Sequence, residues 1–366
     1  MNDNQLTDLE ELGWDSFFQE NFRLLQIPDC IPARVVSEQR HSYRMHSQYG
    51  ELTAKISGKL RYQASTSDQY PAVGDWVAVK QNTDESRGII HAILPRKSKF
   101  SRQAAGNKTE EQVVAANVDT VFIVSGLDGG RNLNLRRIER YLTLAWESGA
   151  TPVIILNKVD LCNNVEERIH DTESVALGVP VHAISATRHL GLEALLTYMG
   201  RGITAALLGP SGVGKSAIIN ALYGSERQQV GEVRESDKRG RHTTTSRELI
   251  ILPGGGLIID TPGMREIQVW GNEGNLNDTF GDIEQIAEKC RFKNCTHLTE
   301  PGCAVQAAIQ RGELDDARFQ NYQKLQREME YQVARQEDRV RLEEKTKWKK
   351  IAQWSKQIKQ TRDRYQ

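Results

Sequence analysis

The pattern of hydrophobic and polar positions changes several times along the chain. In residues 1–33, apolar side chains such as Leu9, Phe18 and Phe22 recur at roughly helical spacing, which predicts an amphipathic helical extension. Residues 34–98 contain short runs of alternating apolar and polar positions, separated by turn residues. These short strands indicate a small β-barrel such as an OB-fold, although any small barrel would fit the same strand count.

A second change follows a polar stretch at 99–117, which is interpreted as a linker. Between 118 and 270, apolar strand-like runs alternate with helical stretches, and this alternation is typical of an α/β domain. Residues 271–330 are predicted to form a helical domain with a cysteine cluster, and residues 331–366 a charged helical tail. The predicted fold class is therefore multidomain, with an N-terminal β-barrel, a central α/β domain and a C-terminal helical domain.

Composition restricts the class of protein only broadly. With 366 residues, of which 38% are hydrophobic and 26% charged, the chain can form two or three globular domains. No apolar run approaches the ~20 residues that cross a bilayer, and no signal-peptide pattern opens the chain. A cytoplasmic protein without membrane contact is therefore expected.

Charge is unevenly distributed although the net charge is zero. The first 20 residues hold six acidic and no basic side chains, whereas residues 318–366 hold 14 Lys or Arg against seven Asp or Glu. A basic tail suggests a polyanionic partner, but a solvated helix end explains it equally well. The tail aromatics Tyr331, Trp348 and Trp354 could stack on nucleotides or pack on the protein itself.

A phosphate-binding loop is the strongest single motif. A GxxxxGKS sequence follows an apolar strand-like run at 204–208 and precedes a helical run at 217–222. Its glycines let backbone N–H groups face phosphate oxygens, and the helix N-terminus adds a potential favourable to anions. Lys215 is predicted to contact the β- and γ-phosphates, and Ser216 to ligate Mg²⁺. The predicted nucleotide contacts in this motif are Gly209, Pro210, Ser211, Gly212, Val213, Gly214, Lys215, Ser216 and Ala217.

Further phosphate-site elements come after the P-loop. Asp260 ends the apolar run at 257–259, and α/β sheets place ligands at such strand ends, so Asp260 is predicted to hold the Mg²⁺ shell. Gly263 would offer its N–H to the γ-phosphate. Thr244 lies in a threonine-bearing loop that is also expected to meet the nucleotide.

Selectivity for guanine is predicted from an NKxD sequence, which comprises Asn157, Lys158, Val159 and Asp160. Guanine presents two N–H donors on one edge, and the Asp160 carboxylate can accept both, whereas adenine presents a mismatched edge. Leaving a buried carboxylate unpaired costs ~1–3 kcal/mol or more, so the wrong base is disfavoured. Asn157 would tie this loop to the P-loop, and the Lys158 stem would pack over the base.

The order of these elements is unusual. Ser185 and Ala186 match the short element that usually follows NKxD, and could give a backbone N–H to the guanine O6 atom. In an ordinary small GTPase the P-loop comes first, whereas here NKxD and the Ser-Ala element precede it. Because domain termini often lie close together, joining them and opening a surface loop can preserve a core. The sequence therefore predicts a circularly permuted P-loop GTPase.

The residue that activates water is less evident. Many GTPases have a glutamine just after the glycine that corresponds to Gly263, and this glutamine positions the attacking water. Here the residue is Met264, which cannot do so. His242 is the best substitute, although it could instead bind a partner or simply be exposed. His242 therefore joins Lys215 and Asp260 in the predicted catalytic set, and the isolated protein is expected to hydrolyse GTP slowly.

The C-terminal cysteine cluster predicts a metal site. Cys290, Cys295, His297 and Cys303 supply three thiols and one imidazole, which match a closed tetrahedral zinc site with no position for water. Such a site is structural, with one Zn²⁺ per chain, and it complements the Mg²⁺ expected with GTP. Reduced cysteines packed in a helix pair remain the alternative.

Several of these features coincide in one family. The motif order, the loop at 240–245, the segment from Cys290 through Cys303 and the barrel segment 73–77 together resemble the circularly permuted, ribosome small-subunit-dependent GTPase A family (RsgA, also called YjeQ). The similarity covers about residues 35–330. It implies an OB domain, a permuted GTPase and a zinc domain. It also implies a role in late maturation of the small ribosomal subunit, with hydrolysis stimulated by that subunit.

The expected partners are GTP and GDP, the small ribosomal subunit and its rRNA, and the protein is expected to be a monomer. An RNA-binding GTP sensor without significant hydrolysis is the alternative, and the intact Lys215, Ser216 and Asp260 weigh against it. A nucleotide-dependent metabolic enzyme is a third hypothesis. It lacks support, because no acid/base pair or nucleophile cluster is evident outside the phosphate site.

Overall fold

The computed structural model describes residues 8–39, 42–64, 66–81, 86–103, 111–129, 132–224, 247–260, 276–334 and 341. Its backbone divides into two compact units. The first comprises residues 1–104, 110–268 and 278–281, and the second comprises residues 105–109, 269–277 and 282–366.

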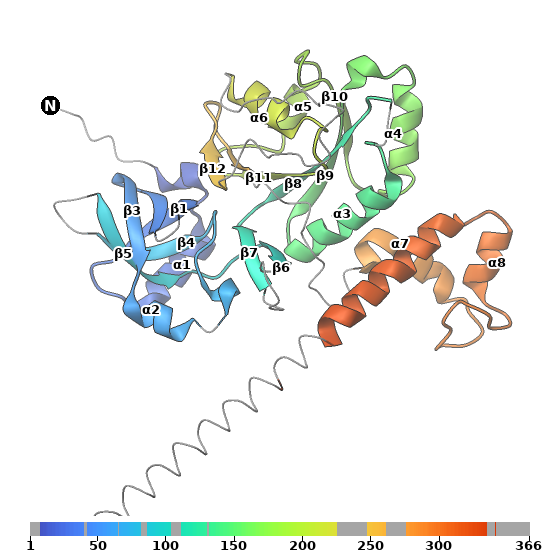
Figure 1. Ribbon diagram of the computed structural model, residues 1–366, viewed down its shortest axis with the longest axis horizontal. Helices are drawn as coiled ribbons and strands as arrows, with labels where there is room; N and C mark the ends of the chain where they lie inside the picture. The colour runs from blue at the N-terminus through green and yellow to red at the C-terminus, as the bar shows by residue number, and fades with distance from the viewer. Residues whose placement is uncertain are drawn as a thin grey trace, which may run out of the picture. The chain divides into compact units, whose positions relative to one another are not determined.

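A closed five-stranded barrel opens the first unit. Its strands are β1 (Ile31–Gln39), β2 (Ser42–Ser47), β3 (Gly50–Ile56), β4 (Trp76–Gln81) and β5 (Arg87–Ile93). They pair in the order β1-β2-β3-β5-β4, and β4 pairs back onto β1, which closes the barrel (Figure 1). Alternating side chains such as Ala33, Val35, Met45, Leu52 and Val77 fill its interior. The predicted N-terminal β-barrel is confirmed.

The segment 99–117 differs from the expected linker. It contains β6 (Lys99–Gln103) and β7 (Glu111–Ala116), which form an antiparallel two-stranded sheet. Its exposed polar residues dominate the composition, but Phe100, Val113 and Val114 are buried. The buried residues of β7 form one short continuous run, from Val113 to Ala116, and the polar residues around this run outweighed it in the sequence pattern.

A six-stranded α/β sheet forms the rest of the first unit. Its strands are β8 (Thr120–Gly126), β9 (Thr151–Asn157), β10 (Val181–Ile184), β11 (Thr204–Leu208), β12 (Glu248–Ile251) and β13 (Leu257–Asp260). They lie in the order β10-β9-β8-β11-β13-β12, with only β12 antiparallel to its neighbour β13. The chain therefore begins this sheet in its middle, at β8, and returns to the middle at β11.

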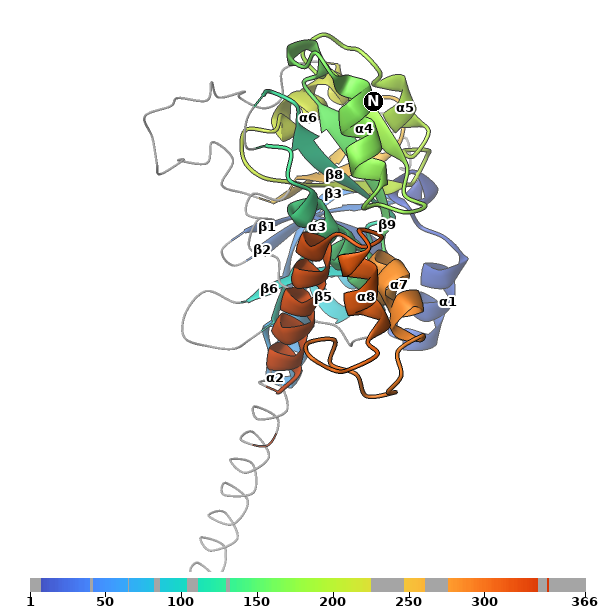
Figure 2. The same cartoon turned by 90° about the vertical axis from the view of Figure 1, so that its right-hand side faces the viewer.

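Helices cover both faces of this sheet. They are α3 (Leu135–Ser148), α4 (Val165–Glu173), α5 (Glu193–Leu196) and α6 (Lys215–Tyr223). On one face of the sheet, Phe122, Val153 and Leu207 lie in a buried core. Leu195 of α5 and Ile219 of α6 belong to the same core. Helix α3 packs against β8 and β9, and α4 against β10. Both views place β8 between α6 and α3 (Figures 1 and 2).

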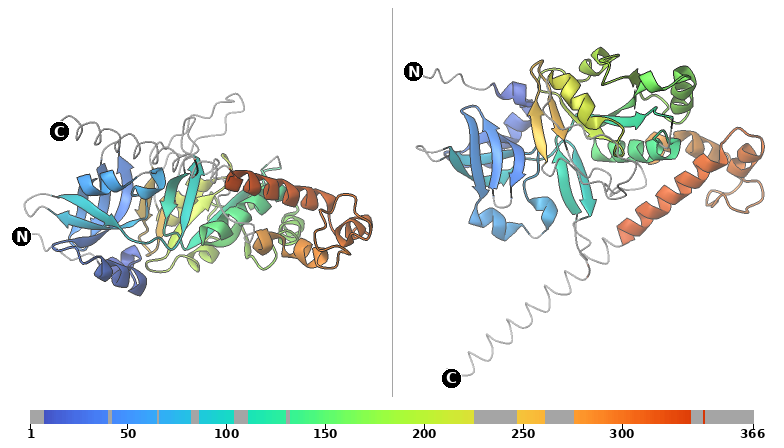
Figure 3. Two further views of the ribbon diagram at one scale, coloured as in Figure 1. Left: turned by 90° about the horizontal axis from the view of Figure 1, so that it is seen from below. Right: turned by 45° about the horizontal axis from the view of Figure 1, so that its top comes forward.

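The barrel and the α/β sheet share hydrogen-bonded strands. Ser37 of β1 pairs with Glu248 of β12, so the two sheets form one continuous 11-stranded sheet. The yellow-orange strands β12 and β13 accordingly lie beside the blue barrel (Figure 3, right). A register shift in the β1–β2 pairing lies between Val35 and Ser37, just before β1 takes up its new partner. A bulge of this kind bends a strand and redirects its pairing.

The fully buried Arg34 side chain joins several segments at this junction. Its guanidinium donates to the carbonyl oxygens of Leu12, Gly74 (3.3 Å) and Asn117 (3.0 Å) and to the hydroxyl of Thr204 (2.8 Å). Burial lowers the pKa of Arg34 to about 10, against the opposing effect of Asp119 and Asp75. The side chain stays charged at neutral pH and links the N-terminal extension, the barrel and β11.

The N-terminal extension packs on the same junction. It consists of η1 (Leu9–Leu12) and α1 (Ser16–Leu25). The ring of Trp14 lies 4.7 Å from that of Trp76 on β4, and Arg201 of the α/β domain forms ion pairs with Asp8 and Glu11.

A glycine is required where the barrel meets β7. Gly74 has a φ of +91°, and a Cβ atom there would lie 2.1 Å from the carbonyl oxygen of Ala116. The neighbouring Asp75 carboxylate is buried and accepts hydrogen bonds from Arg96 at 2.8 and 2.7 Å. These contacts explain why a turn with this sequence opens β4.

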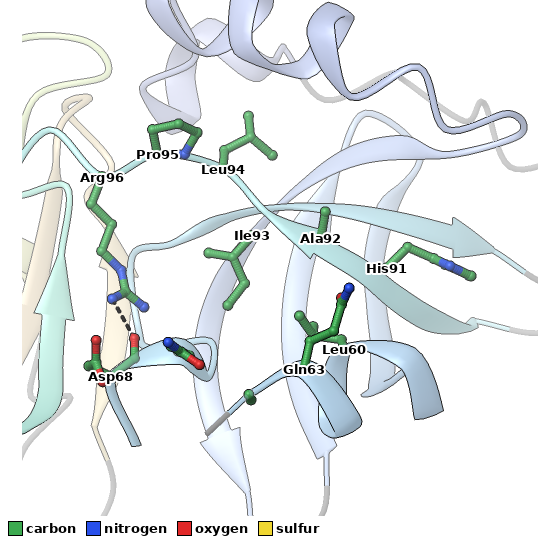
Figure 4. A pocket seen from close by; sticks show the side chains of 11 residues that line it. Leu60, Gln63, Asp68, His91, Ala92, Ile93, Leu94, Pro95 and Arg96 are labelled. Atoms are coloured by element: carbon green, nitrogen blue, oxygen red, sulfur yellow. Dashed lines mark hydrogen bonds between the residues drawn. The ribbon is translucent and has the colours of Figure 1, made fainter. Parts of the chain in front are cut away.

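The barrel also carries a cleft of about 530 Å³ beside α2 (Gly58–Gln63) and η2 (Ser67–Gln69) (Figure 4). Apolar side chains of Leu60 and Ile93 line it together with His91 and Arg96. Arg96 is held at the edge by the carbonyl oxygen of Asp68 at 2.8 Å, which Figure 4 shows as a dashed line. None of the residues that line this cleft belongs to the phosphate or guanine motifs.

The second unit is helical, as the sequence predicted. It contains most of α7 (Leu276–Ala287), α8 (Ala304–Gln310) and a helix over residues 316–334. Arg318 of that helix bonds both carboxylate oxygens of Asp282 on α7, at 3.0 and 2.8 Å. The rest of the basic tail, apart from residue 341, lies outside the described residues. Within the described part of the chain, no helix has the length and apolarity needed to cross a membrane.

Replacing Arg34 tests the junction. Arg34→Met keeps the apolar stem but removes the donor to the carbonyl oxygens of Leu12 and Asn117, whereas the carbonyl oxygen of Gly74 still accepts from the Asn117 side chain at 3.1 Å. We expect the free energy of unfolding to fall by about 3 kcal/mol or more, measured by urea denaturation followed by tryptophan fluorescence. The matched control is Arg23→Met on the exposed face of α1, which should change it by less than about 0.5 kcal/mol. Equal stability of both variants would contradict the role given to Arg34.

Candidate functional site

The strand order changes direction between the neighbouring strands β8 and β11. From β8 the chain moves through α3 to β9, and from the neighbouring β11 it moves through α6 in the opposite direction. The loops that leave two such strands diverge, and α/β sheets bind ligands in the space between them. The P-loop, NKxD and Asp260 all lie at this edge of the sheet.

The P-loop connects β11 with the first residue of α6, Lys215. Gly214 has a φ of +97°, and a Cβ atom there would lie 2.2 Å from the side-chain nitrogen of Asn157. The Lys215 ammonium donates to the carbonyl oxygens of Gly209 (2.8 Å) and Pro210 (2.7 Å). Lys215 thus closes the loop on itself.

The buried Asn157 side chain joins the two permuted halves. Its Nδ2 donates to the carbonyl oxygen of Val213 in the P-loop at 2.8 Å, which is the contact expected for this residue. Its Oδ1 accepts the N–H of Ala186 at 3.0 Å. One amide therefore connects three motifs that are far apart in the sequence.

The NKxD loop turns sharply after β9. Lys158 has a φ of +70°, and its ammonium lies 2.6 Å from the carboxylate of Asp128 in the loop after β8. Asn132 also donates to this carboxylate, at 2.7 Å. Burial alone would raise the pKa of Asp128, but the bonds from Lys158 and Asn132 outweigh it, so its pKa lies below the ordinary value. Asp160 lies in η3 (Val159–Leu161) and is exposed, so a ligand can reach its carboxylate.

Asp128 and Asn132 were not predicted from the sequence as site residues. The available signal was an acidic residue just beyond the apolar run at 118–124, where a strand end carries a loop to the ligand edge.

The Ser185–Ala186 element differs in one respect from its expected role. The N–H of Ser185 donates to the carbonyl oxygen of Leu190, and that of Ala186 donates to Asn157. Both donors therefore have protein partners in this structure. An N–H of this pair would have to leave its partner before it could bind a guanine oxygen.

Asp260 and the P-loop leave the sheet side by side. β13 and β11 pair in parallel, with Ile259 opposite Ala206, so the end of β13 lies next to the strand that enters the P-loop. Ser216 is in the first turn of α6, and both Ser216 and Asp260 are partly buried. His242, Thr244, Gly263 and Met264 lie outside the described residues.

Four side chains of the second unit converge on one point. The ligand atoms of Cys290, Cys295, His297 and Cys303 all lie within 4.8 Å of one another. His297 Nδ1 is 3.5 Å from the sulfur of Cys290 and 3.4 Å from that of Cys303, and these two sulfurs are 3.9 Å apart. A tetrahedral zinc site has edges of about 3.5 Å between N and S and about 3.8 Å between two S atoms. The cluster could therefore hold a metal ion.

Backbone groups support this cluster. Burial alone would raise the pKa of the Cys290 thiol, but the N–H groups of Ala304 and Val305 and the thiols of Cys303 and Cys295 together outweigh it, so its pKa lies below the ordinary value. A lowered pKa favours the thiolate, which is the form that binds metal. Burial and the thiols of Cys303 and Cys290 instead raise the pKa of Cys295 to about 11. His297 has a φ of +59°, and Gln306 donates to its carbonyl oxygen at 2.8 Å.

Comparisons with known proteins agree with this architecture. A sequence model of the RsgA GTPase family matches residues 93–270. The small ribosomal subunit biogenesis GTPase RsgA of Opitutus terrae is 46% identical over 354 residues, covering 94% of this chain and 96% of the relative. The chain belongs to the RsgA GTPase family. A second relative, RsgA 1 of Oceanobacillus iheyensis, is 46% identical over 88% of this chain and 92% of its own length.

Solved structures show the same fold. YjeQ from Thermotoga maritima has a TM-score of 0.60 and 27% identity, covering 82% of this chain and 98% of its own. YloQ, a circularly permuted GTPase, has a TM-score of 0.59 and 22% identity, covering 83% and 96%. In this chain the NKxD sequence follows β9 and the P-loop follows β11 within one sheet, so the predicted permutation of the GTPase domain is confirmed.

A second sequence model, that of ABC transporters, matches residues 192–365. This range includes the P-loop, a loop that many nucleoside triphosphatases use to cradle phosphates. The matched range excludes Asn157 and Asp160. The RsgA assignment, which rests on relatives that cover most of this chain, is unchanged.

Removal of the Asn157 amide tests the assembly of the site. Asn157→Ala loses both hydrogen bonds that hold the P-loop and the Ala186 loop together. We expect the dissociation constant for GDP to rise about tenfold or more, measured by titration with a fluorescent GDP analogue. Asn164→Ala, an exposed asparagine just before α4, is the matched control. An unchanged dissociation constant in Asn157→Ala would mean that this amide does not organise the pocket.

Proposed function

We propose that this GTPase binds the small ribosomal subunit and acts in its late maturation, and that the subunit stimulates hydrolysis of GTP to GDP and phosphate. The hydrogen bonds of Asn157 to both permuted halves carry the nucleotide part of the proposal. The name borne by the relatives, small ribosomal subunit biogenesis GTPase, supports the choice of partner.

The phosphate chemistry is assigned to the P-loop and the neighbouring strand. Backbone N–H groups of the P-loop and the N-terminus of α6 would bind the phosphates, with Lys215 on the β- and γ-phosphates. Ser216 and Asp260 would hold Mg²⁺, which neutralises charge that develops on the transferred phosphate. Thr244 and Gly263 are proposed as further contacts in this part of the site.

Binding of the guanine base is assigned to the NKxD loop. Asp160 is exposed and free to accept the two N–H groups of guanine, and the Lys158 stem, held by Asp128, would cover the base. Asn157 and Val159 shape this loop, while Ser185 and Ala186 would complete the pocket once one N–H is released.

Hydrolysis by the isolated protein is proposed to be slow. Met264 replaces the glutamine that positions water in many GTPases. His242 is proposed to orient the water instead, and the partner is proposed to stimulate this step.

The barrel and the C-terminal segment are proposed to bind RNA. The barrel exposes Tyr49 and Tyr62, whose rings could stack on unpaired bases, and the C-terminal 318–366 segment carries a net positive charge. Phosphate contacts of this kind weaken strongly as salt concentration rises. A cytoplasmic location is proposed because the proposed partner is the ribosomal subunit, and a monomer is proposed because one chain contains every motif of the site.

The rate of GTP hydrolysis in the presence of purified subunits tests the proposal. We expect small subunits to raise the rate about tenfold or more and large subunits to leave it near the basal value. Lys215→Ala should remove the stimulated activity. No stimulation by small subunits would contradict the proposed partner, and an inactive wild type with intact GTP binding would favour a GTP sensor.

For the second unit, we propose a structural Zn²⁺ held by Cys290, Cys295, His297 and Cys303. The three thiols, the imidazole and the tetrahedral spacing of their atoms support zinc, and a closed set of four ligands leaves no position for catalysis.

Metal analysis tests this assignment. We expect about one zinc per chain in the purified wild type and little in His297→Ala, because three ligands bind zinc more weakly than four. Cys162→Ala, which alters a cysteine of the α/β domain, should retain the metal. Purified wild type without stoichiometric zinc would refute the assignment.

A further inference from the structure

A row of directly paired residues crosses from the barrel to the magnesium site. Glu248 of β12 lies between two strands, opposite Ser37 of β1 on one side and opposite Asp260 of β13 on the other. Asp260 is the carboxylate assigned to the Mg²⁺ shell. Only one strand therefore separates the barrel from the acid at the nucleotide site.

Side-chain ion pairs also connect the barrel strands with β12 and the residue before it. Arg44 of β2, the second barrel strand, donates to the carboxylate of Glu248 at 2.6 Å. The preceding residue, Arg247, lies 3.4 Å from Glu38 of β1. Two ion pairs thus cross the same seam, one from each of two barrel strands.

These two ion pairs are partly buried, which distinguishes them from fully exposed ion pairs on a protein surface. The side chains of Arg44 and Glu248 are 40% and 30% exposed, and that of Arg247 is 15% exposed. Burial lowers the pKa of Arg247, and Arg102 acts in the same direction while Glu38 opposes them. A partly desolvated pair resists separation more than a fully exposed one, because solvent screens it less.

The seam also limits how the barrel can move. Ile31 to Arg34 of β1 pair with β4 inside the barrel, whereas Ser37 pairs with β12. Strand pairing is discrete, so a displacement of β1 must either carry β12 with it or break this pairing. β12 in turn is bonded along its whole length to β13, from Glu248 opposite Asp260 to Ile251 opposite Leu257.

We propose that the β1–β12 seam couples the barrel to the nucleotide site, and that Arg44, Glu248, Glu38 and Arg247 are positioning residues for subunit-stimulated hydrolysis. When the barrel binds its RNA partner, the seam transmits the resulting strain to Asp260 through one pair of strands. The inference rests on the proposed function, because it concerns the response to the small subunit. None of the four residues touches the nucleotide in this scheme.

The test compares basal and stimulated hydrolysis in full-length Arg44→Gln. We expect unchanged basal hydrolysis, GDP affinity and affinity for small subunits, but a stimulated kcat that is about three- to tenfold lower than in the wild type. Arg168→Gln breaks a similarly exposed ion pair, with Asp171 at 3.1 Å, that does not cross the seam. This control should be stimulated like the wild type.

A charge exchange separates positioning from direct RNA contact. In Arg44→Glu combined with Glu248→Arg the ion pair is rebuilt in reverse, and we expect most of the lost stimulation to return. If Arg44 bound RNA directly, the acidic replacement would weaken subunit binding in a pelleting assay, and the proposal would be overturned. Full stimulation of Arg44→Gln would also overturn it. A wild type that small subunits fail to stimulate would instead contradict the proposed function itself.

Discussion

The nucleotide site depends on one buried amide. Asn157 bonds the P-loop through Val213 and the Ser-Ala element through Ala186, so the two permuted halves of the GTPase domain meet at its side chain. The close approach of Gly214 to this amide leaves no space for a Cβ atom. Circular permutation is tolerated here because the contacts of the site are between strand ends, and these stay adjacent wherever the chain is cut.

A second buried group, Arg34, integrates the barrel with this domain. Four neutral oxygens from four segments surround its guanidinium, and one belongs to Thr204, the first residue of the strand that enters the P-loop. The shared β1–β12 pairing adds a backbone connection at the far edge of the sheet. The barrel and the α/β sheet are therefore joined by hydrogen bonds at two places, the Arg34 side chain and the β1–β12 pairing.

Several elements were accessible from local sequence because their physics is local. The P-loop needs glycines before a helix start, and NKxD and Asp260 each follow an apolar strand, so spacing alone predicted where they would lie. The cysteine and histidine spacing similarly predicted a four-ligand cluster. The β6–β7 hairpin was misread as a linker, because the short apolar run from Val113 to Ala116 stands among polar residues and its strand partner β6 is itself mostly polar.

The sequence by itself therefore determined the chemistry: phosphate and guanine recognition, a metal-binding cluster, and the order in which the chain supplies them. The tertiary structure decided which groups meet. Lys158 and Asp128 are 30 residues apart, Arg34 and Thr204 are 170 apart, and Arg44 and Glu248 are 204 apart. Such contacts leave no periodic trace in a sequence, since they arise only when strand order brings distant residues to the same edge.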